Sequence, residues 1–515
     1  MQAARYIPNQ TGTGKERSLV PGLALMGVAV LVAIFAVIFT SDSLAAYPNL
    51  HLVPWLIGLG LLMAVPLVYL HYRGRLTFVD PLVFATLSYF FPAFVVGGLS
   101  FALGLSRPSF ENLIQDPQYN LPLTILLVGL GYAGLATGYL LPIGAKLGGW
   151  IADILPKADY KPDSLLFPGV LLLLAGLANT ILAFVLGRFG YQRATEFTSY
   201  DGLIFFTTLF WVQASVLLWS VIFRKSKLDF IVIPIIGVLL FTSLTKFLYS
   251  GSRGNIIQIF LIITFSFILS GRRVSVKQGV IAGLLLTVGL TVGMIYGTTF
   301  RNVKGTEDAQ SAEQYTENIF AAVEQVGRSD VYDTLTFGAV NFAERIDVLS
   351  TLAVVVSNYE ELAPYEEIYG LSNNIWVDLS TFMIPRIIWP DKPVVADPRK
   401  YSDLYFDYSG SSYAITPIGD LLRNYGIIGI PIGMFVLGFL LRLFYRSLIE
   451  GQQPIVWRVT LFFMLLTSVS YEGFYGTIIP VFFKIGFISV IGILVVNMIA
   501  KRIETGSIKG ISASS

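Results

Sequence analysis

The run GVIAGLLLTVGLTVGMIYGTT at residues 279–299 contains no charged side chain and is long enough to cross a lipid bilayer as a single helix. The whole chain shares this character: 54% of its 515 residues are hydrophobic, 13% are charged, and the mean hydropathy is +0.69. Such a composition leaves too little polar surface for a water-soluble protein of this length. The sequence therefore predicts an all-α, polytopic membrane protein.

Apolar runs of about 20 residues, the length that one membrane crossing needs, recur along the chain. We expect about twelve transmembrane helices, of which the eighth and the eleventh are short enough to be tilted or broken. The predicted spans are 22–40, 53–72, 79–105, 121–144, 166–187, 203–223, 230–248, 255–270, 279–299, 424–442, 457–471 and 477–500.

These spans divide one integrated membrane domain into three parts. Residues 1–299 carry helices one to nine, residues 300–416 form a large outer loop with amphipathic helices, and residues 417–515 carry helices ten to twelve and a cytoplasmic tail. Long connections in a membrane domain usually hold function. The large loop is therefore the first place to look for a site.

Lysine and arginine mark every second connection between the predicted spans. They gather before the first span and after the second, fourth, sixth, eighth, tenth and twelfth. Because such residues collect on the cytoplasmic side of membrane proteins, the pattern predicts that both termini are cytoplasmic and that the large loop faces outward. The first run, 22–40, lacks a small-residue cleavage site, so we expect an uncleaved span.

Several classes of site are excluded by the residue types present. The chain has no cysteine, and its only two histidines, His51 and His71, are predicted on opposite sides of the membrane. Disulfides and thiolate sites are thereby ruled out, and a histidine-ligated zinc site is disfavoured. The net charge of +2, without a basic tract interleaved with aromatics, gives no reason to expect nucleic acid as a partner. We predict no metal and no cofactor.

The large loop is acidic, with 18 Asp and Glu against 8 Lys and Arg between residues 300 and 416. Apolar residues at helical spacing from Phe342 to Val355 predict an amphipathic helix that packs on the outer surface of the bundle or acts in gating. A second helix is expected through Ile375 and Met383, ending near Pro385. The rest of that segment, up to Pro393, is a strap pinned by prolines.

Three outward arginines stand out as candidate ligands for a phosphate. Arg253 lies in a very short turn, Arg386 follows a helix stop, and Arg423 enters the tenth span. Planar guanidinium groups bind a pyrophosphate in a bidentate way without a metal, and Lys392 in the strap would add charge. The alternative is interfacial snorkelling, which explains an arginine at a helix end without any ligand.

Carboxylates and aromatic residues occur on the same predicted face. Asp420 and Glu472 are candidate general bases for a sugar hydroxyl, although either is equally an ion-pair partner for an arginine. Aromatic rings suit sugar rings but also belong in the membrane interface. The candidates for glycan contact are Trp389, Tyr249, Asn424 and Tyr471.

Three short motifs, taken in this order, resemble those of the O-antigen polymerase (Wzy-type) family of bacterial oligosaccharide repeat-unit polymerases. They are SRG at 252–254, PRIIWPDKP at 385–393 and GDLLRNYGIIG at 419–429. By motif the resemblance covers roughly residues 230–445, and by topology the whole chain. Many relatives have Glu where this chain has Asp420, which keeps the acid but shortens its reach.

The resemblance implies a metal-independent glycosyltransferase in the bacterial inner membrane, acting at the periplasmic face. It would transfer a growing glycan from one undecaprenyl pyrophosphate carrier to a fresh lipid-linked repeat unit, and so build O-antigen, capsule or exopolysaccharide. The implied partners are the undecaprenyl-pyrophosphate-linked oligosaccharide and membrane lipid. A protein that regulates chain length is a further candidate.

Three other functions compete with this one. The O-antigen ligase pattern includes a histidine in the large outer loop, and residues 300–416 contain none. A polyprenyl-phosphate-sugar glycosyltransferase usually needs acids in its first outer loop, which here offers only Asp42. A lipid-linked oligosaccharide flippase would line a cavity with charge from inside its helices, whereas we expect nearly all charge at span ends or in loops.

Overall fold

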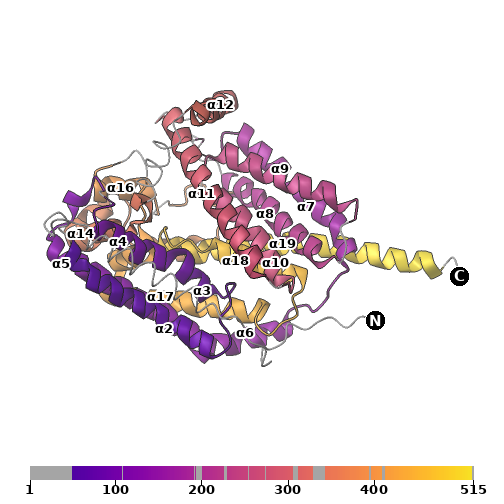
Figure 1. The fold of residues 1–515 in the computed structure, drawn as a ribbon, viewed down its shortest axis with the longest axis horizontal. Helices are drawn as coiled ribbons and strands as arrows, with labels where there is room; N and C mark the ends of the chain where they lie inside the picture. The colour runs from indigo at the N-terminus through magenta and orange to yellow at the C-terminus, as the bar shows by residue number, and fades with distance from the viewer. Residues whose placement is uncertain are drawn as a thin grey trace. The chain divides into compact units, whose positions relative to one another are not determined.

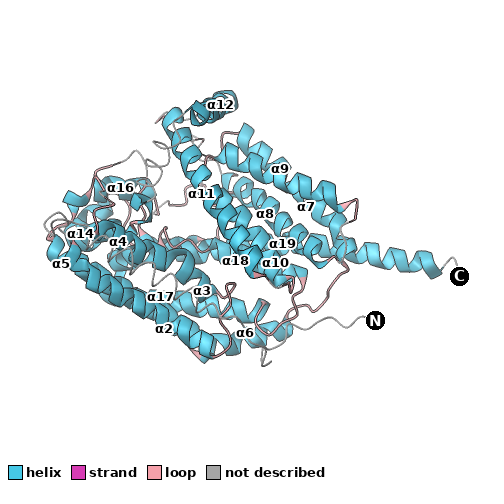
Figure 2. Cartoon of the chain, in the orientation of Figure 1, coloured by secondary structure: helices cyan, strands magenta, loops and turns pink. Residues whose placement is uncertain are grey.

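The computed structural model describes residues 49–512 except 107, 191, 193–199, 226–228, 253, 273, 306–310, 329–342, 394–395 and 409–411. Every regular element in these residues is helical (Figures 1 and 2). The predicted all-α class is thus confirmed for the described part of the chain.

Nine helices in the described residues are long and apolar enough to cross a membrane. They are Leu50–Tyr72, Pro81–Ala102, Pro117–Leu140, Pro162–Val185, Asp201–Arg224, Val232–Ser250, Lys277–Lys304, Thr416–Leu448 and Tyr475–Gly506. The predicted eighth and eleventh spans are shorter apolar helices, α10 (Gly254–Leu269) and α18 (Val456–Ser468). The first predicted span, 22–40, lies outside the described residues.

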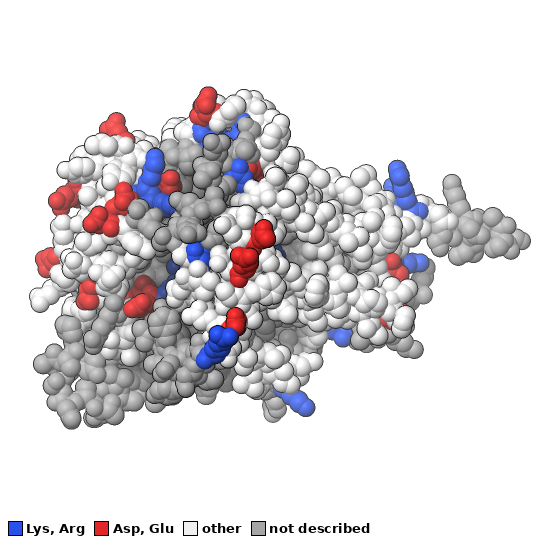
Figure 3. Space-filling view, turned by 90° about the horizontal axis from the view of Figure 1, so that it is seen from above, with Lys and Arg blue, Asp and Glu red and all other residues white. Residues whose placement is uncertain are grey.

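The surface of these helices fits a lipid environment. Large apolar side chains remain exposed along them, among them Leu61 at 66%, Phe241 at 70% and Leu284 at 63%. Figure 3 shows charged residues as separate patches on a largely uncharged surface. Because water would disfavour so much exposed apolar area, the described helices belong in a membrane.

The chain forms two compact units, each built from separate segments. Unit 1 comprises residues 1–141, 340–372 and 397–441, and unit 2 comprises residues 142–339, 373–396 and 442–515. The large loop is therefore shared between the two units.

Unit 1 contains α2 (Val53–Tyr72), a second span made of α3 (Pro81–Ala85), η3 (Thr86–Val96) and α4 (Gly97–Ala102), and α5 (Pro117–Leu140). From the large loop it takes α14 (Val348–Ile368) and α16 (Pro398–Phe406), and then most of α17 (Thr416–Leu448).

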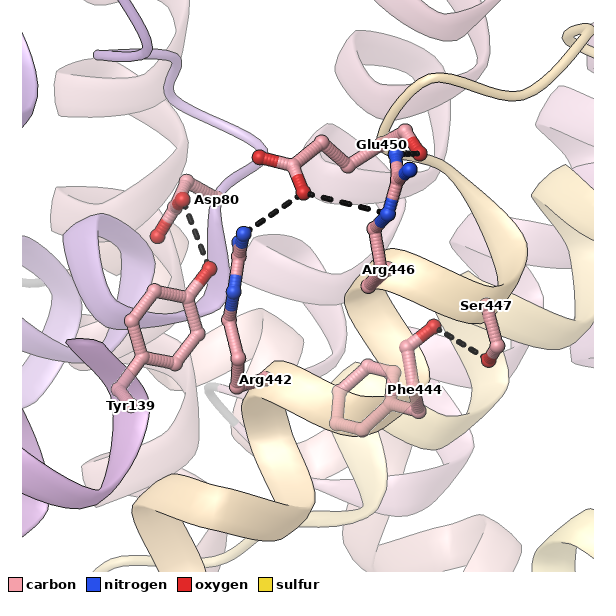
Figure 4. Close-up of polar contacts among 7 residues, drawn as sticks. All are labelled: Asp80, Tyr139, Arg442, Phe444, Arg446, Ser447 and Glu450. Carbon is pink, nitrogen blue, oxygen red and sulfur yellow. Dashed lines mark hydrogen bonds and ion pairs between the residues drawn. The ribbon is translucent and has the colours of Figure 1, made fainter. Parts of the chain in front are cut away.

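Close helix packing holds α5 against α17. A methyl group added at Gly138 would lie 2.1 Å from the carbonyl oxygen of Phe435, so only glycine permits this approach. At the end of α5, the Tyr139 hydroxyl donates a hydrogen bond of 2.7 Å to Asp80, which caps α3 (Figure 4).

Helix α17 is interrupted at Gly426, whose φ of 66° and ψ of −166° are open almost only to glycine. The short helical segment before this break folds back on the longer one. Leu421 consequently packs where a side chain at Gly433 would otherwise lie. The predicted tenth span, 424–442, is thus preceded by a separate segment that carries Asp420 and Arg423.

Unit 2 contains α6 (Pro142–Ile154), α7 (Pro162–Val185), α8 (Asp201–Arg224), α9 (Val232–Ser250), α10 and α11 (Val276–Lys304). It also holds α12 (Ala312–Arg328), α15 (Asn374–Thr381), α18 and α19 (Tyr475–Ser512). Helices α7 and α8 are antiparallel and touch at Gly176, where a methyl group would lie 2.2 Å from the backbone nitrogen of Trp211.

The predicted cytoplasmic connections of unit 2 lie together at one end. Arg272 donates hydrogen bonds to the carbonyl oxygens of Phe223 and Lys225, at 2.7 and 3.1 Å, and Arg224 pairs with Asp159 at 3.6 Å. The connections after α6, α8 and α10 therefore lie at the same end of this unit.

Two arginines at the end of α17 share one acid. Arg442 and Arg446 both point at Glu450, at 2.7 and 4.0 Å (Figure 4). Because Glu450 takes both contacts, this pair of arginines is partly neutralised within unit 2.

The expected surface helix near residue 350 is instead a core element. Phe342 lies outside the described residues, and α14 begins at Val348, with Asp347 as its N-cap. Every side chain from Val348 to Val356 is buried, so this half of the helix has no solvent face. The prediction of an amphipathic surface helix was wrong here because other parts of unit 1 enclose the helix on all sides.

Two other loop helices follow their sequence patterns. Helix α12 buries Tyr315, Ile319 and Ala322 against a cluster that includes Phe247 and Phe300, and is therefore amphipathic. Helix α15 ends at Thr381, so it stops before Pro385 as predicted, but Met383, which was expected within it, lies beyond its end.

Candidate functional site

The short turn that carries Arg253 is placed only in part. Arg253 itself lies outside the described residues. Tyr249, at the end of α9, packs its ring on Phe184 with ring centres 5.3 Å apart and belongs to the aromatic cluster beneath α12. In this arrangement Tyr249 is half-buried and supports the turn.

The strap that follows α15 carries Arg386 and Lys392 in turns without regular secondary structure. Arg386 Nη1 donates to the Pro390 carbonyl at 3.3 Å, which closes the strap on itself. Lys392 Nζ donates to the carbonyls of Thr381 and Ile384 at 2.8 and 3.3 Å. The lysine therefore caps the C-terminal end of α15, where a positive charge is favourable.

A third cation joins these two from the last membrane helix. Lys484 of α19 lies close enough to Lys392 to act on it electrostatically, as does Arg386. Burial, and then the charges of Lys484 and Arg386, lower the pKa of the Lys392 ammonium below its usual value. We call Arg386, Lys392 and Lys484 the strap cluster.

The acid closest to the strap cluster in electrostatic terms is Asp378 of α15, which acts on both lysines. Its Oδ2 atom lies against the first turn of α19, where a methyl group at Gly476 would come within 3.2 Å. Asp391 directly precedes Lys392 in the strap, so the three cations have two neighbouring acids and the region carries an excess of positive charge.

Sequence reasoning missed both Lys484 and Asp378. Lys484 had a visible signal, because it is a lone cation inside the apolar run 477–500. Asp378 had none, because its place beside the cations depends on the packing of α15 against α19. Lys246 is a second lone cation in a span, two residues before the end of the predicted span 230–248.

Glu472 lies in the turn before α19 and is exposed. Its neighbour Tyr471 is 7% exposed, and burial raises the pKa of its hydroxyl. In the strap, Trp389 is 38% exposed. Of these three predicted site residues, Glu472 and Trp389 are accessible and Tyr471 is enclosed.

Asp420 and Arg423 lie in the interior of unit 1. Neither side chain is exposed to solvent. Arg423 Nε pairs with Glu366 at 2.8 Å, and its Nη2 donates to the Leu371 carbonyl at 3.3 Å. Asn424 Nδ2 donates hydrogen bonds to the backbone carbonyl oxygen of Asp420 at 2.8 Å and to its Oδ1 atom at 3.3 Å.

Two tyrosines from α16 complete this buried network. The Tyr405 hydroxyl donates to Glu366 at 2.7 Å, and the guanidinium of Arg423 lies 5.6 and 5.8 Å from the ring centres of Tyr401 and Tyr405. Protein groups thus surround the Arg423 charge on several sides. We call Glu366, Asp420, Arg423, Tyr401 and Tyr405 the buried network.

The predicted site residues consequently fall into different units. The buried network belongs to unit 1, whereas the strap cluster, Glu472 and Tyr471 belong to unit 2. Within the described residues, no group of three or more His, Asp or Glu side chains has an arrangement that fits a metal ion.

Comparison with known families gives one match. Residues 175–491, more than half of the chain, match the family described as a domain of unknown function (DUF8712). Neither the curated proteins nor the solved structures gave a match. The matched region includes the strap cluster and the buried network.

Proposed function

We propose that this chain, which belongs to the DUF8712 family, is a membrane glycosyltransferase that polymerises repeat units linked to undecaprenyl pyrophosphate. The observation that carries the proposal is the excess of positive charge at the strap cluster, where Arg386, Lys392 and Lys484 stand beside two acids, Asp378 and Asp391. A pyrophosphate supplies the dense negative charge that such a group of cations can bind. The order of the three sequence motifs supports the same function.

Arg386 is the member of the strap cluster best suited to grip the leaving group. Its side chain is half-buried, and only one Nη1 contact holds it to the strap. Its planar fork can present two donors to a phosphate, whereas Lys392 and Lys484 act as point charges. The two lysines would stabilise the negative charge that develops as the pyrophosphate leaves.

In the proposed reaction, a hydroxyl oxygen of the acceptor sugar attacks the anomeric carbon of the donor glycan. The bond from that carbon to the pyrophosphate oxygen breaks, and the carrier leaves with the electron pair. The hydroxyl proton passes to a general base. We assign this role to Glu472, because it is exposed beside α19, whereas Asp420 is enclosed in the buried network.

The experiment that tests the polymerase is the ladder of lipid-linked products in a deletion strain. Loss of all multimers with a single capped unit retained supports polymerisation. Complementation with Glu472→Gln should give the same single unit. A deletion strain with a normal ladder would reject the function, and polymerisation that stops in EDTA and returns with magnesium would reject metal independence.

A flippase for the same lipid-linked glycan is the second candidate, and a specific observation favours it. Lys246 and Lys484 are cations inside membrane helices, as expected along a path for an anionic lipid. The deletion strain separates the two functions, because loss of a flippase removes even the single unit from the outer face. Loss of an O-antigen ligase would instead leave the lipid-linked multimers intact and prevent their final transfer.

The polymerase also requires an orientation, which we propose from the basic connections: both termini cytoplasmic and the large loop periplasmic, in a bacterial inner membrane. Ser311 is exposed just before α12. A Ser311→Cys variant of this cysteine-free chain should react with a membrane-impermeant maleimide in intact spheroplasts, and Lys157→Cys should react only after lysis. The reverse pattern would invert the topology.

A further inference from the structure

Lys246 is an ionisable residue inside a membrane helix, and residues of two helices of unit 2 surround it. It belongs to α9, one turn before Ser250, and it is half-buried. Its ammonium lies 4.2 Å from the ring centre of Trp211 in α8. A lysine in such a position is costly in a membrane, so its presence calls for an explanation.

The Trp211 ring is fixed in place on two sides. Its Nε1 donates to Thr242 Oγ1 at 3.3 Å, and Thr242 lies one helical turn before Lys246 on the same side of α9. Behind it, Gly176 of α7 allows the backbone of α8 to come close. Trp211 is 1% exposed, so the ring is a rigid platform that holds the ammonium.

The lysine charge has no counter-ion in the part of the chain that the structure describes. None of the described carboxylates pairs with Lys246, and its ammonium contacts the face of Trp211. An ammonium group has three donors and no acceptor, so one aromatic face leaves it unsatisfied. An anion from outside the described protein groups would complete the site.

The depth of Lys246 points to an anion that is carried by a lipid. Lys246 lies four residues before Ser250, the last residue of α9, which places it about 6 Å from that end of the helix, within reach of the headgroup level. Val238, Thr242 and Lys246 follow one another at four-residue spacing, and Val238 is 44% exposed. This side of α9 therefore opens toward lipid, where phosphate headgroups are the common anions.

We propose that Lys246 and Trp211 form an anion site within the membrane that binds the phosphate of a membrane lipid. Polymerisation requires two lipid carriers, one for the donor and one for the acceptor. Resting on the proposed function, we assign this site to the second carrier, while the strap cluster takes the first. The two sites use different helices of unit 2, α8 with α9 and α15 with α19.

The test uses the full chain purified in detergent. Native mass spectrometry counts the carriers bound after addition of undecaprenyl pyrophosphate, with undecaprenol and phosphatidylglycerol as separate arms. We expect two bound carriers for the wild type and one for Lys246→Met, with Lys246→Arg retaining two. Lys501→Met, which removes an exposed lysine at the far end of α19, should retain two.

Thermal unfolding without lipid separates a ligand site from a structural role. Lys246→Met should unfold at the same temperature as the wild type or a higher one, because it removes an unpaired charge. A lower unfolding temperature together with unchanged lipid binding would overturn the proposal. So would equal binding of undecaprenol, because that lipid lacks phosphate.

The arms also distinguish the two sources of phosphate. If only phosphatidylglycerol depends on Lys246, the lipid-phosphate site stands and its assignment to a carrier is overturned. Since the readout is binding, a failure of the proposed polymerase would appear separately, as a normal glycan ladder in the deletion strain.

Discussion

The buried network of unit 1 and the strap cluster of unit 2 each contain an arginine, but the surroundings of the two arginines differ. Arg423 is enclosed, with Glu366 at 2.8 Å and two tyrosine rings around it. Arg386 lies in the strap with Lys392, close to Lys484 of α19, and the neighbouring acids are Asp378 and Asp391. The difference teaches that an arginine near a membrane surface becomes a ligand candidate only where the protein leaves its charge uncompensated.

Removal of Arg423 is the change with the largest expected effect. Arg423→Ala leaves Glu366 buried without its partner, which typically costs about 3–5 kcal/mol of folding free energy. Thermal unfolding and yield in detergent should both fall sharply. The double variant Glu366→Leu with Arg423→Met should recover much of the loss, because it removes both charges together.

The contrast between the two arginines would be wrong if the Arg423→Ala variant folds like the wild type but fails to polymerise repeat units. In that case Arg423 would belong to the ligand site. Arg399→Ala, an exposed arginine on α16, is the matched control and should change neither property.

Removal of Arg386 should have the reverse effect, on activity and not on folding. Arg386→Ala is expected to lower polymerisation about a hundredfold, which corresponds to about 3 kcal/mol of transition-state stabilisation. Arg386→Lys should be impaired less, because it keeps the charge but loses the fork. An unchanged rate in an in vitro polymerisation assay would return Arg386 to a purely structural role.

Asp347 should make the folding stability of unit 1 depend on pH. It caps α14 and accepts from Ser106 at 2.9 Å, and burial raises the pKa of its carboxyl from 3.8 to about 6. Between those values the folded state binds the proton more tightly than the unfolded state does. Stability from this group therefore rises as the pH falls from about 6 to about 4, by up to about 3 kcal/mol.

Asp347→Asn keeps a capping acceptor without the charge. Its unfolding temperature should consequently depend less on pH over the same range than that of the wild type. An identical pH dependence in the two proteins would show that Asp347 keeps an ordinary pKa, and that unit 1 tolerates a buried charge at the start of α14.

The smallest expected effect concerns Gly426, which turns the segment carrying Asp420 and Arg423. Gly426→Ala forces a side chain into a backbone conformation that only glycine adopts readily, at a cost of about 1–3 kcal/mol. Thermal unfolding measures this loss. Gly506→Ala, in the exposed end of α19, has open space around it and should be neutral. Equal stability of the two variants would mean that α17 can straighten.

The sequence predicted the helices well because crossing a membrane demands a long apolar run, and such runs are visible one by one. All described spans lie where the hydropathy placed them, and the two short runs became the two short helices. The strap was also foreseen, because Pro385 and Pro390 restrict the backbone locally.

The environment of each charged residue could not be predicted in this way. Nothing local indicated that Arg423 would meet Glu366, 57 residues earlier in the chain, or that Lys484 would lie beside the strap. The helix at 348–368 was predicted wrongly for the same reason. Its spacing indicated one apolar face, whereas packing in unit 1 buries every side of its first half.

By itself, then, the sequence determined a helical membrane protein, its spans, the proline strap and the residue types available for chemistry. The tertiary structure decided which charges are neutralised inside the protein and which are left for a ligand. The physical reason is that hydropathy is a property of a segment, whereas the compensation of a charge depends on partners that only folding brings within a few ångströms.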